Sequence, residues 1–227
     1  MSQSRTFEHS DRFQFLPLTD EITERGRVYT TPEGNKYPSV TTVIGGVGDH
    51  SGLDEWRARV GEEEAKLVSR IASKRGTAVH ETVEKYLKND LEYLSDANYA
   101  TKNSFRKLKP ALDKHMGTIF GLEVALYSDK LRCAGRVDNI AEWDGELSIV
   151  DFKTSRNEKQ RDWITNYFLQ ESAYAYFFYE RTGVPIGQLV TVITVDDGSC
   201  QVFVERTRDW IEKFFGVRKE FGSRHGW

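Results

Sequence analysis

The central part of the chain alternates hydrophobic and polar residues, and the parts on either side repeat hydrophobic residues every three to four positions. Strand-like patterns cover residues 119–127, 131–143, 147–153, 188–195 and 201–205. Helical spacing covers residues 53–75, 77–87, 101–108, 161–181 and 208–221. Two shorter strands, 27–31 and 36–40, flank a turn sequence at 32–35. This order predicts a mixed α/β domain with one central mixed β-sheet flanked by helices.

Glycine and proline residues set the expected boundaries between these elements. Gly76 is expected to separate the first two helices, the earlier of which is interrupted near Gly61. Pro110 is expected to stop the third helix, because proline removes a backbone donor and clashes with the preceding turn. The sequence Asp196-Asp197-Gly198 predicts a hairpin turn between the last two strands.

The length of 227 residues favours a single domain. We expect residues 1–12 to be disordered and residues 13–75 to form an N-terminal β-hairpin with a helical extension. Residues 76–206 are expected to form the core, and residues 207–227 a C-terminal helix.

Composition narrows the class of protein. The net charge of -3 excludes a chain coated in positive charge, although a local basic groove would still suffice for a nucleic acid. No apolar run approaches the roughly 20 residues of a membrane helix, and the first ten residues lack the apolar centre of a signal peptide. Two cysteines, Cys133 and Cys200, indicate a reducing compartment and are too few for a four-cysteine iron–sulfur cluster.

Two carboxylates and a lysine stand at the ends of neighbouring predicted strands. Asp151 and Lys153 follow a buried apolar run and share one strand face, since side chains alternate. A turn between the strands over 131–143 and 147–153 would bring Asp138 level with Asp151. Carboxylates converging beside a lysine are typical of a hard-cation site with a base or charge stabiliser. Taken alone, an Asp-x-Lys triplet is more often a surface ion pair.

Further groups accompany this triplet in a fixed order: Gly76-Thr77-Ala78-Val79-His80, Glu123, and Gln170-Glu171-Ser172-Ala173-Tyr174. With them the chain resembles, over about residues 38–180, the RecB-like branch of the PD-(D/E)xK nuclease superfamily. The segments Pro38-Ser39-Val40-Thr41-Thr42-Val43 and Asp151-Phe152-Lys153-Thr154-Ser155 are most similar to the mitochondrial genome maintenance exonucleases and their phage relatives. The resemblance implies a restriction-endonuclease-like core.

The resemblance also assigns roles to the candidate residues. Asp138, Asp151 and the Phe152 carbonyl would hold Mg²⁺ or Mn²⁺, and His80 would approach the metal. Lys153 would orient or deprotonate a water, or stabilise the pentacoordinate phosphorus, and these alternatives stay open. Glu123 is either a further metal ligand or one half of a salt bridge. Gln170 and Tyr174, four apart on one helix face, would brace the site and touch DNA or simply pack.

Candidate DNA contacts are hydroxyl and basic side chains near these motifs. They are Ser39, Thr41, Thr42, Lys66, Arg70, Lys74, Arg75, Arg106, Lys107, Thr154 and Ser155. The basic residues repeat at helical spacing and indicate a phosphate-tracking groove, although most charge runs are solvated faces. The hydroxyl groups at 39, 41 and 42 could equally cap a helix.

The sequence therefore predicts a Mg²⁺- or Mn²⁺-dependent deoxyribonuclease, an exonuclease on single-stranded DNA ends in replication, recombination or repair. The alternatives are an endonuclease of the same superfamily and a nucleic-acid-binding module without catalysis. We expect a monomer without a membrane partner. The expected compartment is the cytoplasm, that of a bacterial host if the chain is phage-encoded, rather than the mitochondrial matrix.

Overall fold

The computed structural model describes residues 5–49, 51–196 and 198–227. The first four residues of the segment expected to be disordered, and Asp197 of the predicted hairpin turn, lie outside the described residues. The strands are β1 (Thr19–Thr23), β2 (Gly26–Thr30), β3 (Lys36–Pro38), β4 (Met116–Ser128), β5 (Cys133–Trp143), β6 (Glu146–Ser155), β7 (Gln188–Val195) and β8 (Cys200–Arg206). The helices are α1 (Val40–Val47), α2 (Ser51–Val60), α3 (Glu62–Leu87), α4 (Tyr99–His115), α5 (Thr165–Thr182) and α6 (Thr207–His225), with a 3-10 helix, η1, at Arg161–Trp163.

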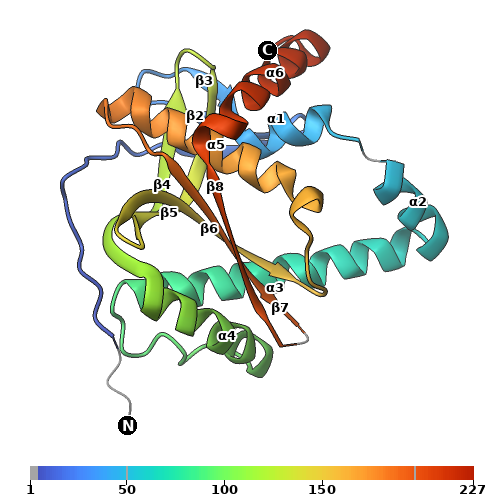
Figure 1. Cartoon of the computed structure of the whole chain (residues 1–227). Helices are drawn as coiled ribbons and strands as arrows, with labels where there is room; N and C mark the ends of the chain where they lie inside the picture. The colour runs from blue at the N-terminus through green and yellow to red at the C-terminus, as the bar shows by residue number, and fades with distance from the viewer. Residues whose placement is uncertain (1–4, 50, 197) are drawn as a thin grey trace.

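A five-stranded sheet in the order β4-β5-β6-β7-β8 forms the centre of the molecule (Figure 1). Neighbouring strands within this sheet are antiparallel, except for β6 and β7, which run parallel and are joined through α5. Strands β1, β2 and β3 form a small antiparallel sheet beside it. The predicted fold class, a mixed α/β domain with a central mixed sheet flanked by helices, is confirmed.

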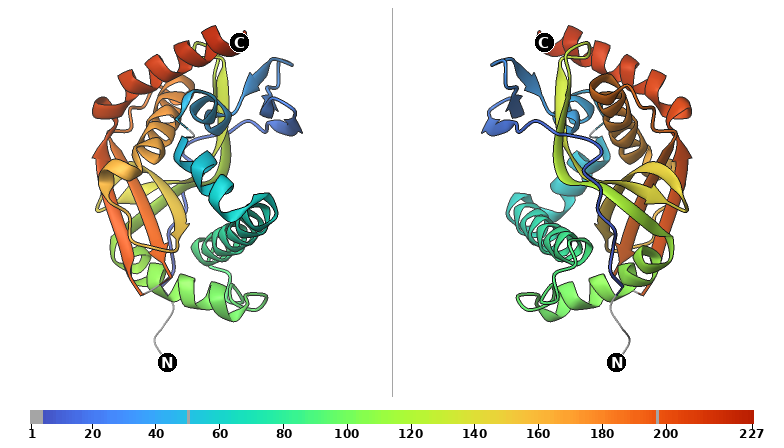
Figure 2. Two further views of the ribbon diagram at one scale, coloured as in Figure 1. Left: turned by 90° about the vertical axis from the view of Figure 1, so that its right-hand side faces the viewer. Right: turned by 90° about the vertical axis from the view of Figure 1, so that its left-hand side faces the viewer.

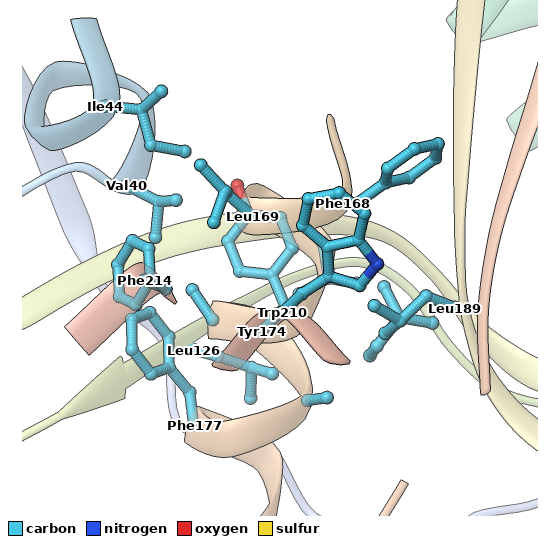
Figure 3. Close-up of a cluster of buried hydrophobic side chains, with 14 of the residues drawn as sticks. Val40, Ile44, Leu126, Phe168, Leu169, Tyr174, Phe177, Leu189, Trp210 and Phe214 are labelled. Carbon is cyan, nitrogen blue, oxygen red and sulfur yellow. The ribbon is translucent and has the colours of Figure 1, made fainter. Parts of the chain in front are cut away.

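One face of the central sheet is covered by α1, α5 and α6 (Figures 1 and 2). Figure 3 shows side chains of this cluster, with Val40 and Ile44 from α1 beside Phe177 from α5 and Phe214 from α6. Helix α5 is buried along much of its length, which explains why its apolar residues continue around the helix instead of forming one stripe.

The opposite face is covered by α3 and α4. Val79, Val83 and Leu87, on one side of α3, are fully or almost fully buried against it. Because these residues fix the helix against the sheet, they also determine where their neighbour His80 lies. Among the described residues, no helix combines the length and apolar character needed to cross a bilayer.

Residues 5–12 pack against the rest of the fold, so the expectation that these residues are disordered is wrong. Phe7 is buried in the cluster beneath α3 and α4, and its backbone exchanges hydrogen bonds with the side chain of Asn89. The backbone around His9 pairs with β4 at Ile119. The segment thereby covers the outer edge of β4, which would otherwise present unpaired backbone groups.

Two predicted helix boundaries are wrong. Helix α3 continues through Gly76, and α4 continues through Pro110 to His115. A glycine inside a helix costs about 1 kcal/mol and a proline about 3 kcal/mol. Fully buried Leu112, beyond the proline, and Val79, beyond the glycine, pack against the core and offset these costs. The break predicted near Gly61 is present, since α2 ends at residue 60 and α3 begins at residue 62.

The sequence predicts a strand over 36–40 and only a possible helix cap at residues 39, 41 and 42, so the extent of helix α1 was not predicted. The strand ends at Pro38, and Ser39 caps the helix by accepting a hydrogen bond from the Thr42 backbone N–H at 3.0 Å. Val40, Val43 and Ile44 then bury one face of this short helix. The cap places the hydroxyl groups of residues 39–42 at the border between the small sheet and the central sheet.

Candidate active site

Asp138 and Asp151 lie side by side at the point where β5 and β6 separate. The antiparallel pairing of the two strands ends at Asn139 and Val150, and the next residues along the strands are the two aspartates. The Asp138 carboxylate accepts a hydrogen bond from the Phe152 backbone N–H at 2.9 Å. The turn between β5 and β6 therefore brings the carboxylates level, as predicted, with the Phe152 backbone beside Asp138.

His80 projects from α3 toward the same point. Its Nδ1 atom lies 3.5 Å from Asp138 Oδ2 and 4.0 Å from Glu123 Oε1. One possible ligand atom from each of these three residues lies within 4.8 Å of the others. The structure thus gathers a nitrogen and two carboxylate oxygens from a helix and two strands into a cluster small enough to surround one cation.

Glu123 occupies an unusual backbone conformation within β4. Its φ is 52°, in the left-handed region, although Leu122 and Val124 on either side remain paired with β5. The Arg136 guanidinium donates a hydrogen bond to the Glu123 carbonyl oxygen at 2.7 Å. A non-glycine residue held in this region costs on the order of 1–3 kcal/mol, and such residues concentrate at functional sites.

Asp151 and Lys153 form a buried ion pair on β6. Only 2% of the Asp151 side chain and 21% of the Lys153 side chain are exposed. The Gln170 amide on α5 donates hydrogen bonds to Asp151 Oδ1 at 3.2 Å and to the Tyr174 hydroxyl at 3.3 Å. The Lys153 ammonium lies 5.1 Å from the centre of the Tyr167 ring. Gln170 therefore reaches the predicted carboxylate, and Tyr174 contacts Gln170.

Burial and charge shift the pKa values of these groups. Burial raises the pKa of Asp151 to about 6, against the opposing effect of the Lys153 ammonium. Burial would lower the pKa of His80, but the carboxylates of Asp138 and Glu123 outweigh it and raise that pKa to about 9. For Lys153 burial favours the neutral amine, yet Asp151 and Asp138 raise its pKa above the ordinary value. At neutral pH both His80 and Lys153 are therefore positively charged.

These groups open into a pocket of about 500 Å³. His80, Glu123, Asp138, Gln170 and Tyr174 line it, whereas the buried Asp151 is not part of the lining. Glycines at 76 and 135 complete the wall without side chains. A Cβ atom on the second of them would come within 2.6 Å of the Tyr174 ring, so this glycine permits the close packing of α5 on β5.

The predicted DNA contacts fall into two groups. Some have structural partners: Arg75 pairs with Asp196, Lys107 donates to the carbonyl oxygens of Val195 and Asp196, Lys66 pairs with Glu62, Ser39 and Thr42 bond within the α1 cap, and Ser155 donates to Asn157. Thr41 is exposed and also bonds to the Ser39 hydroxyl in that cap. The second group is Arg70, Lys74 and Arg106, which are exposed, and Thr154, which is half-buried. Only Ser39 and Thr41 among all of these line the pocket.

Several residues near the site were not predicted, among them two arginines and a buried glutamate. Arg27 on β2 and Arg136 on β5 both line the pocket. Arg136 lies two residues before the predicted ligand Asp138, but nothing in the sequence distinguishes it from an ordinary exposed strand residue. Glu171, beside Gln170, is completely buried and accepts a hydrogen bond from Thr191. Burial, followed by the nearby Asp151 charge, raises its pKa well above the usual range.

No protein-family model and no curated protein sequence matches the chain. Among solved structures, it is similar to a "Putative exonuclease" from Eubacterium rectale at 10% identity and a TM-score of 0.46, over 66% of this chain and 65% of that chain. It is also similar to Rai1 from Scheffersomyces stipitis at 14% identity and a TM-score of 0.28, over 92% of this chain and 55% of that chain. The chain thus spans less than two thirds of either protein. At these TM-scores the similarities carry no argument, and the function has to be argued from the site.

Proposed function

We propose that the chain is a Mg²⁺- or Mn²⁺-dependent deoxyribonuclease of the PD-(D/E)xK type, acting as an exonuclease on single-stranded DNA ends. The observation that carries this proposal is the convergence of His80, Glu123 and Asp138 within 4.8 Å, next to the Asp151–Lys153 pair. The preference for single strands and for ends comes from the sequence resemblance, as do the monomeric state and the cytoplasmic location that we propose.

The donor set fits a hard or borderline divalent cation. Carboxylate oxygens suit Mg²⁺ and Mn²⁺, and an added imidazole nitrogen favours Mn²⁺. Asp138, Asp151 and the Phe152 carbonyl would hold the cation, and His80 and Glu123 would be further ligands. When bound, the cation supplies charge neutralisation at the phosphate and acidifies water. Without it, the carboxylates of Glu123 and Asp138 would repel a phosphodiester from the pocket.

The protein groups around the cluster have separate tasks. The Lys153 ammonium is held by Asp151 and can donate hydrogen bonds to a phosphate oxygen as negative charge develops there. Because it is protonated, we assign it charge stabilisation rather than proton abstraction. Gln170 holds Asp151 Oδ1 in place and is in turn within reach of Tyr174. Gln170 is therefore a positioning residue that acts through Asp151.

The test is a cleavage assay on linear single-stranded DNA labelled at either end, with linear duplex and circular single strands alongside. Each substrate is incubated with Mg²⁺, Mn²⁺ or EDTA. We expect metal-dependent loss of the linear single strand alone, and the two labels would report the direction of digestion. Cutting of the circle would replace the exonuclease by an endonuclease, because a circle has no end.

Lys153→Ala is the matched variant for this assay. We expect it to lose at least about a hundredfold in cleavage, since transition-state charge stabilisation is worth that much, while it keeps its fold and its affinity for DNA. Lys130→Ala changes an exposed lysine at the β4–β5 turn and serves as the control for loss of one positive charge. Cleavage within tenfold of the wild-type rate in Lys153→Ala would remove this role. Binding without cleavage by the wild type would leave a nucleic-acid-binding module.

A further inference from the structure

The pocket lining includes a pair of arginines that the proposed chemistry does not use. Arg27 comes from β2 and Arg136 from β5, and they are the only arginine or lysine side chains in the described lining of the pocket. Their side chains are 46% and 40% exposed. The remaining charged lining residues are His80 and the carboxylates of Glu81, Glu84, Glu123 and Asp138. Arg27 and Arg136 are therefore the basic part of the pocket lining, here called the basic wall.

The two guanidinium groups share one carboxylate, that of Asp20 on β1. Arg27 Nε lies 3.6 Å from Asp20 Oδ2, and Arg136 Nη2 lies 4.0 Å from Asp20 Oδ1. Both distances exceed those of a charge-assisted hydrogen bond. One negative charge therefore stands between two positive ones without a close bond to either. Such a partly exposed contact is weak and exchangeable.

Asp20 can leave this position with little disturbance of the fold. All five residues of β1 are exposed, and the strand pairs only with β2, at the outer edge of the small sheet. Figure 2 shows the small sheet projecting from the side of the central sheet. Arg136 is anchored more firmly, because it also donates to the Glu123 carbonyl oxygen at 2.7 Å.

The position of Arg136 relates this basic wall to the candidate metal cluster. Arg136 and Asp138 are two residues apart on β5, so their Cα atoms are separated by roughly 7 Å along the strand. Successive phosphates of a single nucleic-acid strand are separated by a similar distance. A strand with one phosphate at the cluster would therefore bring a neighbouring phosphate to the guanidinium groups.

We propose that Arg27 and Arg136 form a subsite for a non-scissile phosphodiester of a single-stranded nucleic acid, and that Asp20 occupies this subsite until the strand binds. The inference rests on the proposed function for the identity of the ligand. In this arrangement the Asp20 carboxylate competes with the phosphodiester for the two guanidinium groups. Removing the Asp20 charge therefore strengthens binding of the strand, whereas removing a guanidinium group weakens it. Effects of opposite sign distinguish this arrangement from an ordinary surface ion pair.

The test measures binding of a fluorescein-labelled single-stranded oligodeoxynucleotide without terminal phosphates, by fluorescence anisotropy in EDTA and again in Ca²⁺. We expect Arg27→Ala to lower affinity about tenfold or more and to reduce the slope of log K against log salt by about 0.7, the value for one contact to a single strand. We expect Asp20→Asn to raise affinity about two- to fivefold, the range for an exposed ion pair. In the Arg27→Ala background that gain should shrink, because the carboxylate has lost one of its partners.

The controls remove the same charges at the start of α6, at residues that do not line the pocket. Arg208→Ala removes an arginine that is 86% exposed on α6, and Asp209→Asn removes its neighbouring carboxylate. Both should bind like the wild type. The inference is overturned if Arg27→Ala matches Arg208→Ala, if Asp20→Asn binds no more tightly than Asp209→Asn, or if the wild type binds no single strand in either condition.

Failure of the subsite proposal can be distinguished from failure of the proposed nuclease function. A protein that binds through Arg27 but cleaves nothing would keep the subsite and lose the nuclease. Conversely, metal-dependent cleavage with no effect of either arginine or of Asp20 would keep the nuclease and lose the subsite. The same binding measurement is repeated with a 5′-phosphorylated oligonucleotide. If Arg27→Ala lowers the affinity for that form alone, the arginines bind a terminal phosphate and the diester assignment is wrong.

Discussion

Gln170 on α5 donates a hydrogen bond to Asp151 on β6, with 3.2 Å between Nε2 and Oδ1. The bond crosses from the helix layer to the sheet and ends on a carboxylate of which only 2% is exposed. The other oxygen of this carboxylate faces the Lys153 ammonium. Asp151 is therefore oriented from both sides before any ligand arrives, and its two partners can be removed one at a time.

Replacing Gln170 by methionine should lower cleavage about ten- to hundredfold, the usual range for removing a group that orients a metal ligand. The side-chain length is retained, but the buried Asp151 Oδ1 loses its donor, so we expect the unfolding free energy to fall by about 1–3 kcal/mol. Calorimetric titration should show weaker Mn²⁺ binding in the same variant, a result that a purely structural role would not produce. Tyr174→Phe removes only an acceptor of Gln170 and should have a smaller effect. Equal losses of cleavage in the two variants would contradict the assignment of Gln170 as the residue that positions Asp151.

Metal affinity should depend on pH through His80. Its pKa of about 9 means that the metal-free protein holds a proton there at neutral pH, and a cation has to displace that proton. Asp151 has a pKa of about 6 and is already ionised above that pH. Any change in metal affinity between pH 6 and 9 is therefore due to the deprotonation of His80. We expect Mn²⁺ affinity to rise by up to about tenfold per pH unit there.

Calorimetry at several pH values would measure this dependence. In His80→Gln the affinity should be lower at high pH and nearly independent of pH across the same range. The same proton stabilises the metal-free fold, because the folded pKa of His80 lies above its ordinary value of 6.5. That stabilisation is fully present below pH 6.5 and is lost as the pH rises toward 9. A wild-type affinity that does not change over this range would exclude His80 as a ligand.

The sequence carried enough information for the central sheet and for the order of the site residues. The eight residues of β7 were predicted with their observed bounds, because a continuous apolar run between turn signals has few alternatives. Strand alternation and one turn were enough to predict that Asp138, Asp151 and Lys153 lie close together. Their catalytic and metal-binding roles stay predictions until the site is assayed, as do those of His80 and Glu123.

What the sequence did not predict depends on tertiary contacts. Pro110 lies inside a helix because distant apolar partners offset its cost, and no local pattern encodes those partners. Glu123 adopts a left-handed backbone conformation, which cannot be predicted from a glutamate in a strand pattern. Arg27 reaches the pocket only because the small sheet folds back against β5. Arg75 and Lys107, predicted from charge patterns as DNA contacts, bond to Asp196 and Val195 at the end of β7, which no charge pattern indicates.

Glu171→Gln should stabilise the protein above the ordinary pKa of a glutamate, with a gain that grows with pH. Glu171 is completely buried, and burial raises its pKa well above 4.5. The folded state therefore retains a proton that the unfolded chain releases, so its stability falls as the pH rises above 4.5. Glutamine has nearly the same shape and carries no such proton.

Chemical unfolding at several pH values would measure the difference. Near pH 4.5 the variant and the wild type should be similarly stable, and above it the variant should gain up to about 1.4 kcal/mol per pH unit. Thr191 should continue to donate its hydrogen bond to the amide oxygen. Glu180→Gln is an unsuitable control because that carboxylate accepts several hydrogen bonds, whereas Glu212→Gln changes a solvent-exposed position on α6. A difference that is independent of pH would contradict the buried proton.

Gly135→Ala should destabilise the fold, because the added methyl group would lie 2.6 Å from the Tyr174 ring. Tyr174 is 3% exposed and cannot move aside freely. Overpacking of this kind costs about 1–3 kcal/mol, measurable as a lower unfolding midpoint in urea. Cleavage should fall as well, since Tyr174 and Gln170 share a hydrogen bond. Unchanged stability would mean that α5 can move away from β5 without loss.

Gly76→Ala should have the opposite effect on stability. In this variant the nearest atom to the new methyl group is Thr154 Oγ1 at 3.9 Å, an ordinary contact. Alanine in place of glycine within α3 should therefore add roughly 0.5–1 kcal/mol to the unfolding free energy. Because Gly76 lines the pocket, the same methyl group would narrow the space beside His80, and we expect weaker binding of a single strand. A variant that is both more stable and equally able to bind would show that the strand does not pass over this turn of α3.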